Sequence, residues 1–128
     1  MIVIDTKKLD DTERQVKCPT GGFESLRMLV KSDNMGFSMT RTTVHPTADF
    51  QRWHYQDHLE ACYCISGRGL LKGADSIVHQ IGPGTLYALD QHDEHWFRAI
   101  ERVELICVFN PPLVGHELHG PDGSYTAP

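Results

Sequence analysis

The sequence predicts an all-β fold, a barrel or sandwich of short strands, in a single domain over residues 1–128. Short segments rich in Val, Ile, Thr, Tyr and Phe alternate with Gly, Pro, Asp and Asn along the whole chain. A helical period is weak throughout, and the one helical turn that we expect lies around residues 6–14. No repeat, low-complexity tract or linker divides the chain, and a domain of this size can bury a core without disulfides or structural metal.

The expected strands follow one another in order, each next to a turn. Residues 2–4 open the fold. A Thr-Gly-Gly turn precedes a strand over residues 23–30, and Ser-Asp-Asn leads into a strand over residues 35–44. The remaining strands are expected over residues 51–55, 59–65, 69–72, 77–81, 85–89, 95–100 and 103–109.

The composition excludes several classes of partner. The net charge is −5 and the 12 Lys and Arg residues are scattered, so we expect no nucleic-acid surface. No segment approaches the roughly 20 apolar residues of a membrane span, and the N-terminus turns polar too early for a signal peptide. Cys62 and Cys64 alternate within an apolar run, which favours small core residues over a disulfide framework. We therefore expect a soluble, reduced, cytoplasmic protein.

The last segment, residues 110–128, has a different composition. It holds four of the seven prolines and three of the eleven glycines, yet it also contains Glu117, His119 and Tyr125. Two interpretations stay open at this point: a solvated tail, or a C-terminal flap over the mouth of the barrel.

Polar side chains are concentrated just before and within the strand over residues 59–65. Because side chains alternate along a strand, His58 and Glu60 share a face with Cys62 and Cys64. Cysteine is among the most buried residue types, so this face is expected to be the interior. A glutamate there needs a partner or a cation. The alternative is an exposed edge, with the intervening residues facing inward.

A second polar group surrounds a predicted hairpin. A Gly-Pro-Gly turn leads into the strand that carries Tyr87, and a polar turn over residues 90–94 precedes His95. Tyr87 and His95 thus lie at facing ends of the hairpin, where their side chains can converge. Taken alone, a tyrosine such as Tyr87 is more often a half-buried core residue.

These segments resemble the motifs of the cupin family, which implies a jelly-roll-like cupin β-barrel. Glu60 and Gly67 have the spacing that ends the first cupin motif, and Gly84 is followed by two residues and then Tyr87, where the second motif has a His ligand. The His-x-His of the first motif is absent, with Tyr55 near its place. The common set of three His and one Glu cannot be assembled, so a different ligand set, or no metal, is expected.

The chain resembles the ectoine synthases, a family of cupin-type enzymes, more closely. The matching stretches run in order over nearly the whole chain and comprise residues 33–38, 58–61, 86–93, 107–112 and 123–125. The resemblance implies that iron(II) is held by Glu60, Tyr87 and His95, although zinc or manganese can occupy such an oxygen and nitrogen set.

The same resemblance implies a reaction, which is the dehydrating cyclisation of N-γ-acetyl-L-2,4-diaminobutyrate to ectoine, a compatible solute made under osmotic stress. It also implies a homodimer. An amide carbonyl is a poor electrophile, so a metal Lewis acid is a natural remedy, and ring closure also needs a base and a proton donor. Both reacting groups belong to one molecule, so folding it inside the barrel supplies proximity.

Further site residues are expected around the ligands. Tyr55 is the first candidate for proton handling, because a phenol can both accept and donate a proton, while Glu117 and His119 correspond to family residues that contact substrate. Arg27 suits the substrate carboxylate through a bidentate pair. Phe23, Thr40, Thr42 and Phe109 fall at pocket positions, and His58 is placed to support Glu60. For each residue the competing interpretation is ordinary packing or a surface position.

Departures from the family pattern bear on the substrate. Phe23 and Thr40 stand where Trp and Asn are expected, and residues 45–53 look unlike the family. Two competing functions stay open. The first is a related metal-dependent enzyme, either another cyclase or a hydrolase that mainly opens the ring. The second is a metal-free cupin sensor that binds a small amino-acid derivative.

Overall fold

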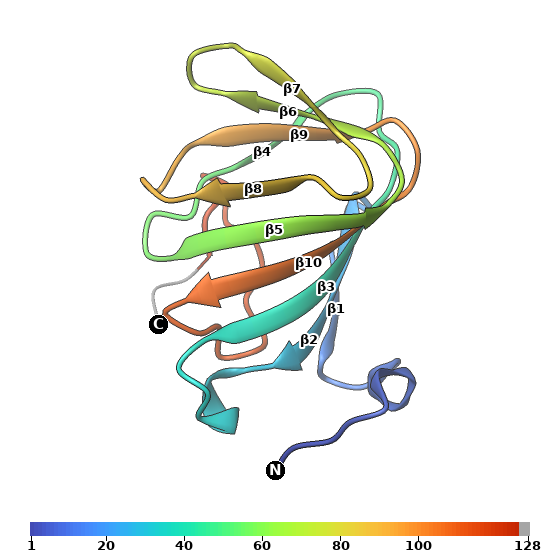
Figure 1. Cartoon of the computed structure of the whole chain (residues 1–128), viewed down its shortest axis with the longest axis vertical. Coiled ribbons are helices and arrows are strands. Elements are labelled where there is room, and N and C mark those ends of the chain that lie inside the picture. The colour runs from blue at the N-terminus through green and yellow to red at the C-terminus, as the bar shows by residue number, and fades with distance from the viewer. Residues whose placement is uncertain (126–128) are drawn as a thin grey trace.

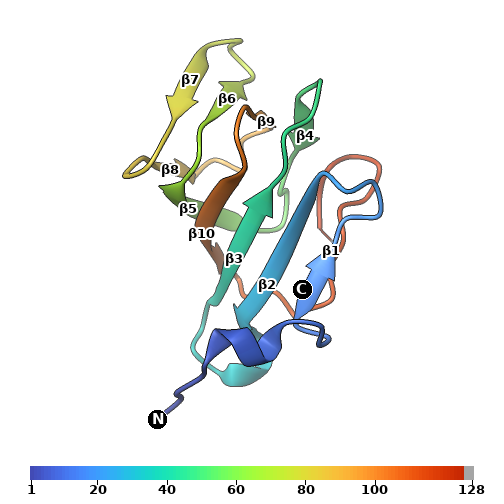
Figure 2. The same cartoon turned by 90° about the vertical axis from the view of Figure 1, so that its right-hand side faces the viewer.

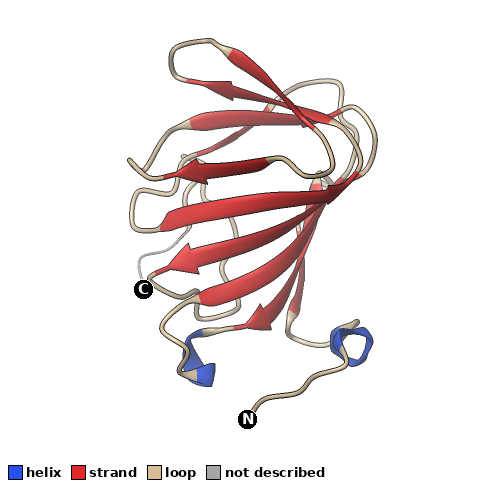
Figure 3. Cartoon of the chain, in the orientation of Figure 1, coloured by secondary structure: helices blue, strands red, loops and turns tan. Residues whose placement is uncertain are grey.

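The computed structural model describes residues 1–125 and forms a β-barrel of two antiparallel sheets that face each other (Figure 1 and Figure 3). The larger sheet has the strand order β1 (Gln15–Lys17), β2 (Phe23–Leu29), β3 (Ser38–Val44), β10 (Val103–Asn110), β5 (Leu59–Ser66) and β8 (Leu86–Leu89). The smaller sheet has the order β4 (Gln51–Trp53), β9 (His95–Ala99), β6 (Gly69–Gly73) and β7 (Val78–Ile81). Two short 3-10 helices, η1 (Thr6–Leu9) and η2 (Lys31–Asp33), complete the described elements. The all-β prediction is confirmed.

The core lies between the two sheets, and every long strand alternates toward it. In β10, for example, Val103, Leu105, Cys107 and Phe109 are buried, while the residues between them are half-buried on the outer face. No helix within residues 1–125 is long and apolar enough to cross a membrane.

The first strand was predicted wrongly. Residues 2–4 pair with no strand within residues 1–125, and Ile2, Val3 and Ile4 are exposed by 40% or more. The segment extends away from the barrel (Figure 2). The edge position is taken instead by β1, whose short sequence Gln15-Val16-Lys17 gives no strand signal of its own and depends on pairing with β2. The expected helical turn is present only as η1.

The register of the larger sheet brings its functional side chains to one face. Strand β5 lies between β10 and β8, with Glu60 opposite Phe109 and Cys62 opposite both Cys107 and Tyr87. Glu60 and Cys62 are buried, whereas Tyr63 on the other face of β5 is 47% exposed. The predicted inward orientation of Glu60 is therefore confirmed, and the exposed-edge alternative is excluded.

The C-terminal segment folds back against the inner side of the larger sheet and the end of β4 (Figure 1 and Figure 2). The backbone N–H of Leu113 donates to Ser38 Oγ at 2.9 Å, and the N–H of His54 donates to the Gly123 carbonyl at 2.9 Å. Gly123 has φ +77°, and a Cβ there would lie 2.6 Å from the carbonyl oxygen of Arg52, so only glycine permits this approach. The flap interpretation is confirmed for the described part of this segment; residues 126–128 lie outside it.

Candidate active site

A small cavity of about 20 Å³ lies inside the barrel, below the C-terminal flap. Aromatic rings form much of its wall, and a carboxyl group, two thiols and a threonine hydroxyl supply its polar atoms. The lining residues are Phe23, Thr42, Trp53, Tyr55, Glu60, Cys62, Tyr87, Leu105, Cys107, Phe109, His119 and Tyr125. A space of this size holds about one water molecule, so a larger ligand requires the flap or side chains to move.

Glu60 is the carboxyl group in the lining of this cavity. It is 8% exposed, and within residues 1–125 no basic side chain forms an ion pair with it. Burial raises its pKa well above the usual value for a glutamate. A carboxylate is costly in such a place unless a cation compensates it.

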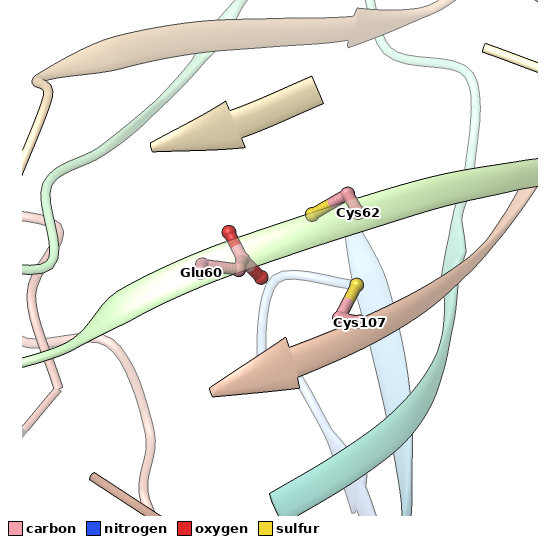
Figure 4. Close-up of side chains that lie close together, drawn as sticks. All are labelled: Glu60, Cys62 and Cys107. Carbon is pink, nitrogen blue, oxygen red and sulfur yellow. The ribbon is translucent and has the colours of Figure 1, made fainter. Parts of the chain in front are cut away.

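Two thiols lie next to the carboxylate. One oxygen of Glu60 and the sulfur atoms of Cys62 and Cys107 all lie within 4.8 Å of one another, and the three side chains point toward a common space (Figure 4). Tyr87 lies directly opposite Cys62 on the neighbouring strand β8. The sequence predicted a core position for Cys62 but gave none for Cys107, and their proximity was not predicted because it depends on the register between β5 and β10.

Tyr87 links this cavity to a second hollow. An open groove of about 810 Å³ between β7 and β8 is lined by Tyr87 and His95 among others. His95 is 1% exposed, and its Nδ1 lies 2.9 Å from the Asp93 carbonyl, which fixes the proton on Nδ1. Its Nε2 is buried and has no hydrogen-bond partner among residues 1–125. A lone pair held free in this way is what a metal-ligating histidine presents.

The donor set therefore fits a divalent cation. A buried carboxylate without a cationic partner, a phenol and an imidazole with a free Nε2 offer two oxygens and one nitrogen around adjoining spaces. Such mixed sets suit iron, manganese or zinc.

Tyr55 and His119 form a hydrogen-bonded pair in the cavity wall, with Tyr55 Oη 2.7 Å from His119 Nε2. Burial raises the pKa of Tyr55 well above its usual range. Burial, together with the charge of Arg27 and the proximity of His95, lowers the pKa of His119 to about 3. At neutral pH the pair therefore consists of a phenol and a neutral imidazole. The His119 ring also stacks on Tyr125 and Trp53, at centroid distances of 4.5 and 5.5 Å.

Arg27 and Glu117 are packed together beside the cavity. Arg27 is fully buried, so the surface alternative is excluded; its Nη2 donates to the Glu117 carbonyl at 2.9 Å and its Nη1 lies 3.7 Å from Glu117 Oε1. Nη1 makes no hydrogen bond to any group in the described part of the chain. The Glu117 carboxylate accepts hydrogen bonds from the N–H groups of Val114 and Gly115. Burial alone would raise the pKa of Glu117, but these backbone donors and Arg27 lower it.

The remaining predicted residues lie at different depths. Phe23, Thr42 and Phe109 line the cavity. Thr40 is buried one step away, with its hydroxyl 3.3 Å from that of Thr42. His58 is also buried, and neither of its ring nitrogens has a hydrogen-bond partner.

Five lining residues had not been predicted as site residues: Trp53, Cys62, Leu105, Cys107 and Tyr125. The alternation of the strand over residues 51–55 could have identified Trp53, which shares a face with Tyr55. Tyr125 had no such signal, because its position depends on how the flap folds.

Comparisons with known proteins agree with this architecture. The solved cupin domain of Schizosaccharomyces pombe Cnp3 superimposes with a TM-score of 0.59 at 8% identity, over 70% of this chain and 64% of that one. KdgF from Halomonas sp. superimposes with a TM-score of 0.63 at 14% identity, over 74% and 85% of the two chains. At these identities the likeness concerns the fold alone. The molecule is thus a cupin-type barrel with a polar site enclosed inside it.

Closer relatives define the family. The family model described as "Ectoine synthase" matches residues 1–128. The chain is 52% identical over 126 residues to the L-ectoine synthase of Teredinibacter turnerae, which covers 98% of this chain and 95% of the relative. It is 49% identical over 123 residues to that of Desulfatibacillum aliphaticivorans, covering 93% and 94%. The crystal structure of ectoine synthase from P. lautus superimposes with a TM-score of 0.84 at 36% identity, over 90% and 81% of the two chains. This chain belongs to the ectoine synthase family, and the predictions of an ectoine synthase, a lyase, and of a cupin barrel are confirmed.

Proposed function

We propose that the enclosed site closes N-γ-acetyl-L-2,4-diaminobutyrate into ectoine with loss of water, assisted by a divalent metal, with iron(II) as the first choice. The observation that carries the metal is Glu60, a buried carboxylate without an ion-pair partner within residues 1–125, in a cavity that also holds a phenol. Glu60, Tyr87 and His95 would hold the ion. When bound, it would supply Lewis acidity toward the acetyl-amide carbonyl.

Tyr55 and His119 are suited to move the two protons that ring closure requires. The substrate α-amine must lose a proton to attack, and the departing oxygen must gain protons to leave as water. Tyr55 and His119 share one hydrogen bond. In either tautomer of His119, one of the two outer atoms, His119 Nδ1 and the Tyr55 hydroxyl oxygen, is then a free donor and the other a free acceptor. We propose that His119 Nδ1, which has no hydrogen-bond partner within residues 1–125, accepts a proton from the amine and that the Tyr55 hydroxyl delivers one to the departing oxygen. A second transfer of this kind, from the nitrogen of the adduct, supplies the other proton of the water.

Arg27 and Glu117 are suited to bind and orient the substrate rather than to transfer protons. Arg27 Nη1 retains donors that make no protein hydrogen bond, and a substrate carboxylate is a natural acceptor for them. The Glu117 carboxylate is already engaged by two backbone N–H groups of the flap. In this proposal Glu117 positions Arg27 and the flap. The pocket wall is shaped by Phe23, Thr42 and Phe109. Thr40 and His58 pack outside this wall and support it.

The flap closes the site against water. Its contacts with β4 and with Arg27 hold His119 in the cavity wall, so substrate entry must displace it. Closing after entry would exclude water from the reacting groups and keep the cyclic amidine from hydrolysis.

Product analysis tests the proposed reaction directly. Purified, iron-loaded protein is incubated with the acetylated diamine, and the substrate and the cyclic amidine are followed by NMR. The proposal expects stoichiometric conversion that a chelator abolishes and that added iron(II) restores. Binding without conversion would instead support a sensor, and conversion that survives the chelator would contradict the metal.

We also propose a homodimer. The exposed apolar segment Ile2-Val3-Ile4 extends from the barrel, and β1 and β8 leave open edges in the larger sheet, so a second copy can receive this segment as an added strand. Sedimentation of the full chain should give a dimer, and deletion of residues 1–5 should give a monomer with its circular dichroism unchanged. A monomeric full chain would contradict this proposal.

A further inference from the structure

Cys62 and Cys107 have no part in the proposed ring closure, although they lie in the wall of its cavity. They face each other across β5 and β10, both are free and both are buried. Their sulfur atoms and a carboxylate oxygen of Glu60 form a group in which every pair of atoms is within 4.8 Å. Figure 4 shows that the three side chains come from two neighbouring strands and converge on one space.

We propose that Glu60, Cys62 and Cys107 form a binding site for a thiophilic divalent ion such as Zn²⁺ or Cd²⁺. In a tetrahedral site with Zn–S bonds of about 2.3 Å, two sulfurs lie roughly 3.8 Å apart and a sulfur and an oxygen about 3.6 Å apart. Both separations fit inside the observed 4.8 Å limit. Each thiol that binds releases its proton to solvent, and the fourth position is left for Tyr87 or for water.

This site would compete with the ligand set of the catalytic metal, a point that rests on the proposed function. Two thiolates select thiophilic ions, whereas a carboxylate, a phenolate and an imidazole accept iron. Glu60 belongs to both sets, so an ion bound to Cys62 and Cys107 would remove it from Tyr87 and His95. The enzyme would then lose its iron when a thiophilic metal binds to Cys62 and Cys107.

Cadmium binding tests the site, because bonds between thiolate sulfur and Cd²⁺ absorb in the ultraviolet and report sulfur ligation directly. Metal-free, fully reduced full-length protein is titrated with Cd²⁺. We expect one ion per chain, and we expect Cys62→Ser or Cys107→Ser to halve the absorbance and weaken binding by about 100-fold or more, at or above the upper end for the loss of an outer-shell partner. Because the two variants lie on different strands, the second can still be measured if the first does not fold.

Cys64→Ser is the matched control, since Cys64 lies on the same strand and the same inner face but its thiol donates to the Ser66 carbonyl instead. It and Cys18→Ser should leave both absorbance and affinity unchanged. Wild-type protein without sulfur-to-cadmium absorbance, or an equal loss in Cys64→Ser, would overturn the proposal.

Competition tests the shared carboxylate. Protein loaded with one equivalent of Cd²⁺ should take up less than a tenth of the iron(II) bound by the metal-free protein, and simultaneous full loading would contradict the sharing of Glu60. The two proposals fail separately. Cadmium binding in a protein that does not form ectoine would refute only the proposed function, and ectoine formation without cadmium–sulfur bonds would refute only this site.

Discussion

Replacement of Tyr55 by Phe tests the proton pair most sharply, because it removes one hydroxyl and leaves the ring in place. The Tyr55 hydroxyl lies 2.7 Å from His119 Nε2, in the cavity wall. Its loss leaves a largely buried ring nitrogen without a partner, at a cost of about 1–3 kcal/mol. For a chain of this length that corresponds to a fall in Tm of about 4–12 °C. The packing of the ring on Phe109 and Tyr125, at 5.3 and 4.9 Å between centroids, is retained.

Turnover should fall further than stability. General acid–base groups contribute about 10²–10⁴-fold, so Tyr55→Phe should lose at least about 100-fold in kcat while it keeps its bound metal. Calorimetry, metal analysis and NMR detection of ectoine measure the three quantities on one preparation. Tyr63→Phe on the exposed face of β5 is the control and should change none of them. A Tyr55→Phe enzyme with kcat within threefold of wild type would refute the assignment.

Three further predictions concern stability. Burial raises the pKa of Glu60, so the folded metal-free protein holds this proton more tightly than the unfolded chain does. The resulting stabilisation is full below the unfolded pKa of about 4.3 and is lost as pH rises through the raised folded pKa. Metal-free Glu60→Gln should therefore have a higher Tm than wild type at pH 8 and no advantage at pH 4 by calorimetry, and a pH-independent difference would contradict this cause. Glu117→Gln leaves the fully buried Arg27 without its counter-charge and should lower the free energy of unfolding, measured in urea, by about 3 kcal/mol. The control Arg41→Gln breaks an exposed pair with Glu104 and should lower it by less than about 1 kcal/mol. Equal losses in the two variants would argue against a buried pair. Gly123→Ala cannot keep both φ +77° and the close approach to Arg52, so it should release the flap. Limited proteolysis should then cleave the flap faster than in wild type. Unchanged cleavage would count against the anchoring role of Gly123.

Local patterns were sufficient to predict much of this fold. Alternation along residues 59–65 correctly placed Glu60 and Cys62 inside, because an antiparallel strand with one buried face imposes a period of two. The turn residues delimited most strands to within a few positions. The same reasoning failed for residues 2–4, since apolar β-branched residues form a strand only where the chain path brings them beside a sheet edge, and no local pattern specifies that path.

The site was harder to predict where it depends on long-range register. Cys62 and Cys107 meet only because β5 and β10 pair in one register, and nothing local in either segment specifies that register. The burial of Arg27 against Glu117 likewise joins residues far apart in the sequence through the folding of the flap. The ligand set of Glu60, Tyr87 and His95 came from family resemblance and stays a prediction.

The central claim is that Glu60, with Tyr87 and His95, holds a cation that turnover requires. The most direct measurement is the metal content of iron-loaded Glu60→Ala protein, determined beside its rate of ectoine formation and compared with the exposed-residue control Glu101→Ala. We expect one iron per chain and normal turnover in wild type and control, and neither in Glu60→Ala. Full iron content or full turnover in folded Glu60→Ala would contradict it.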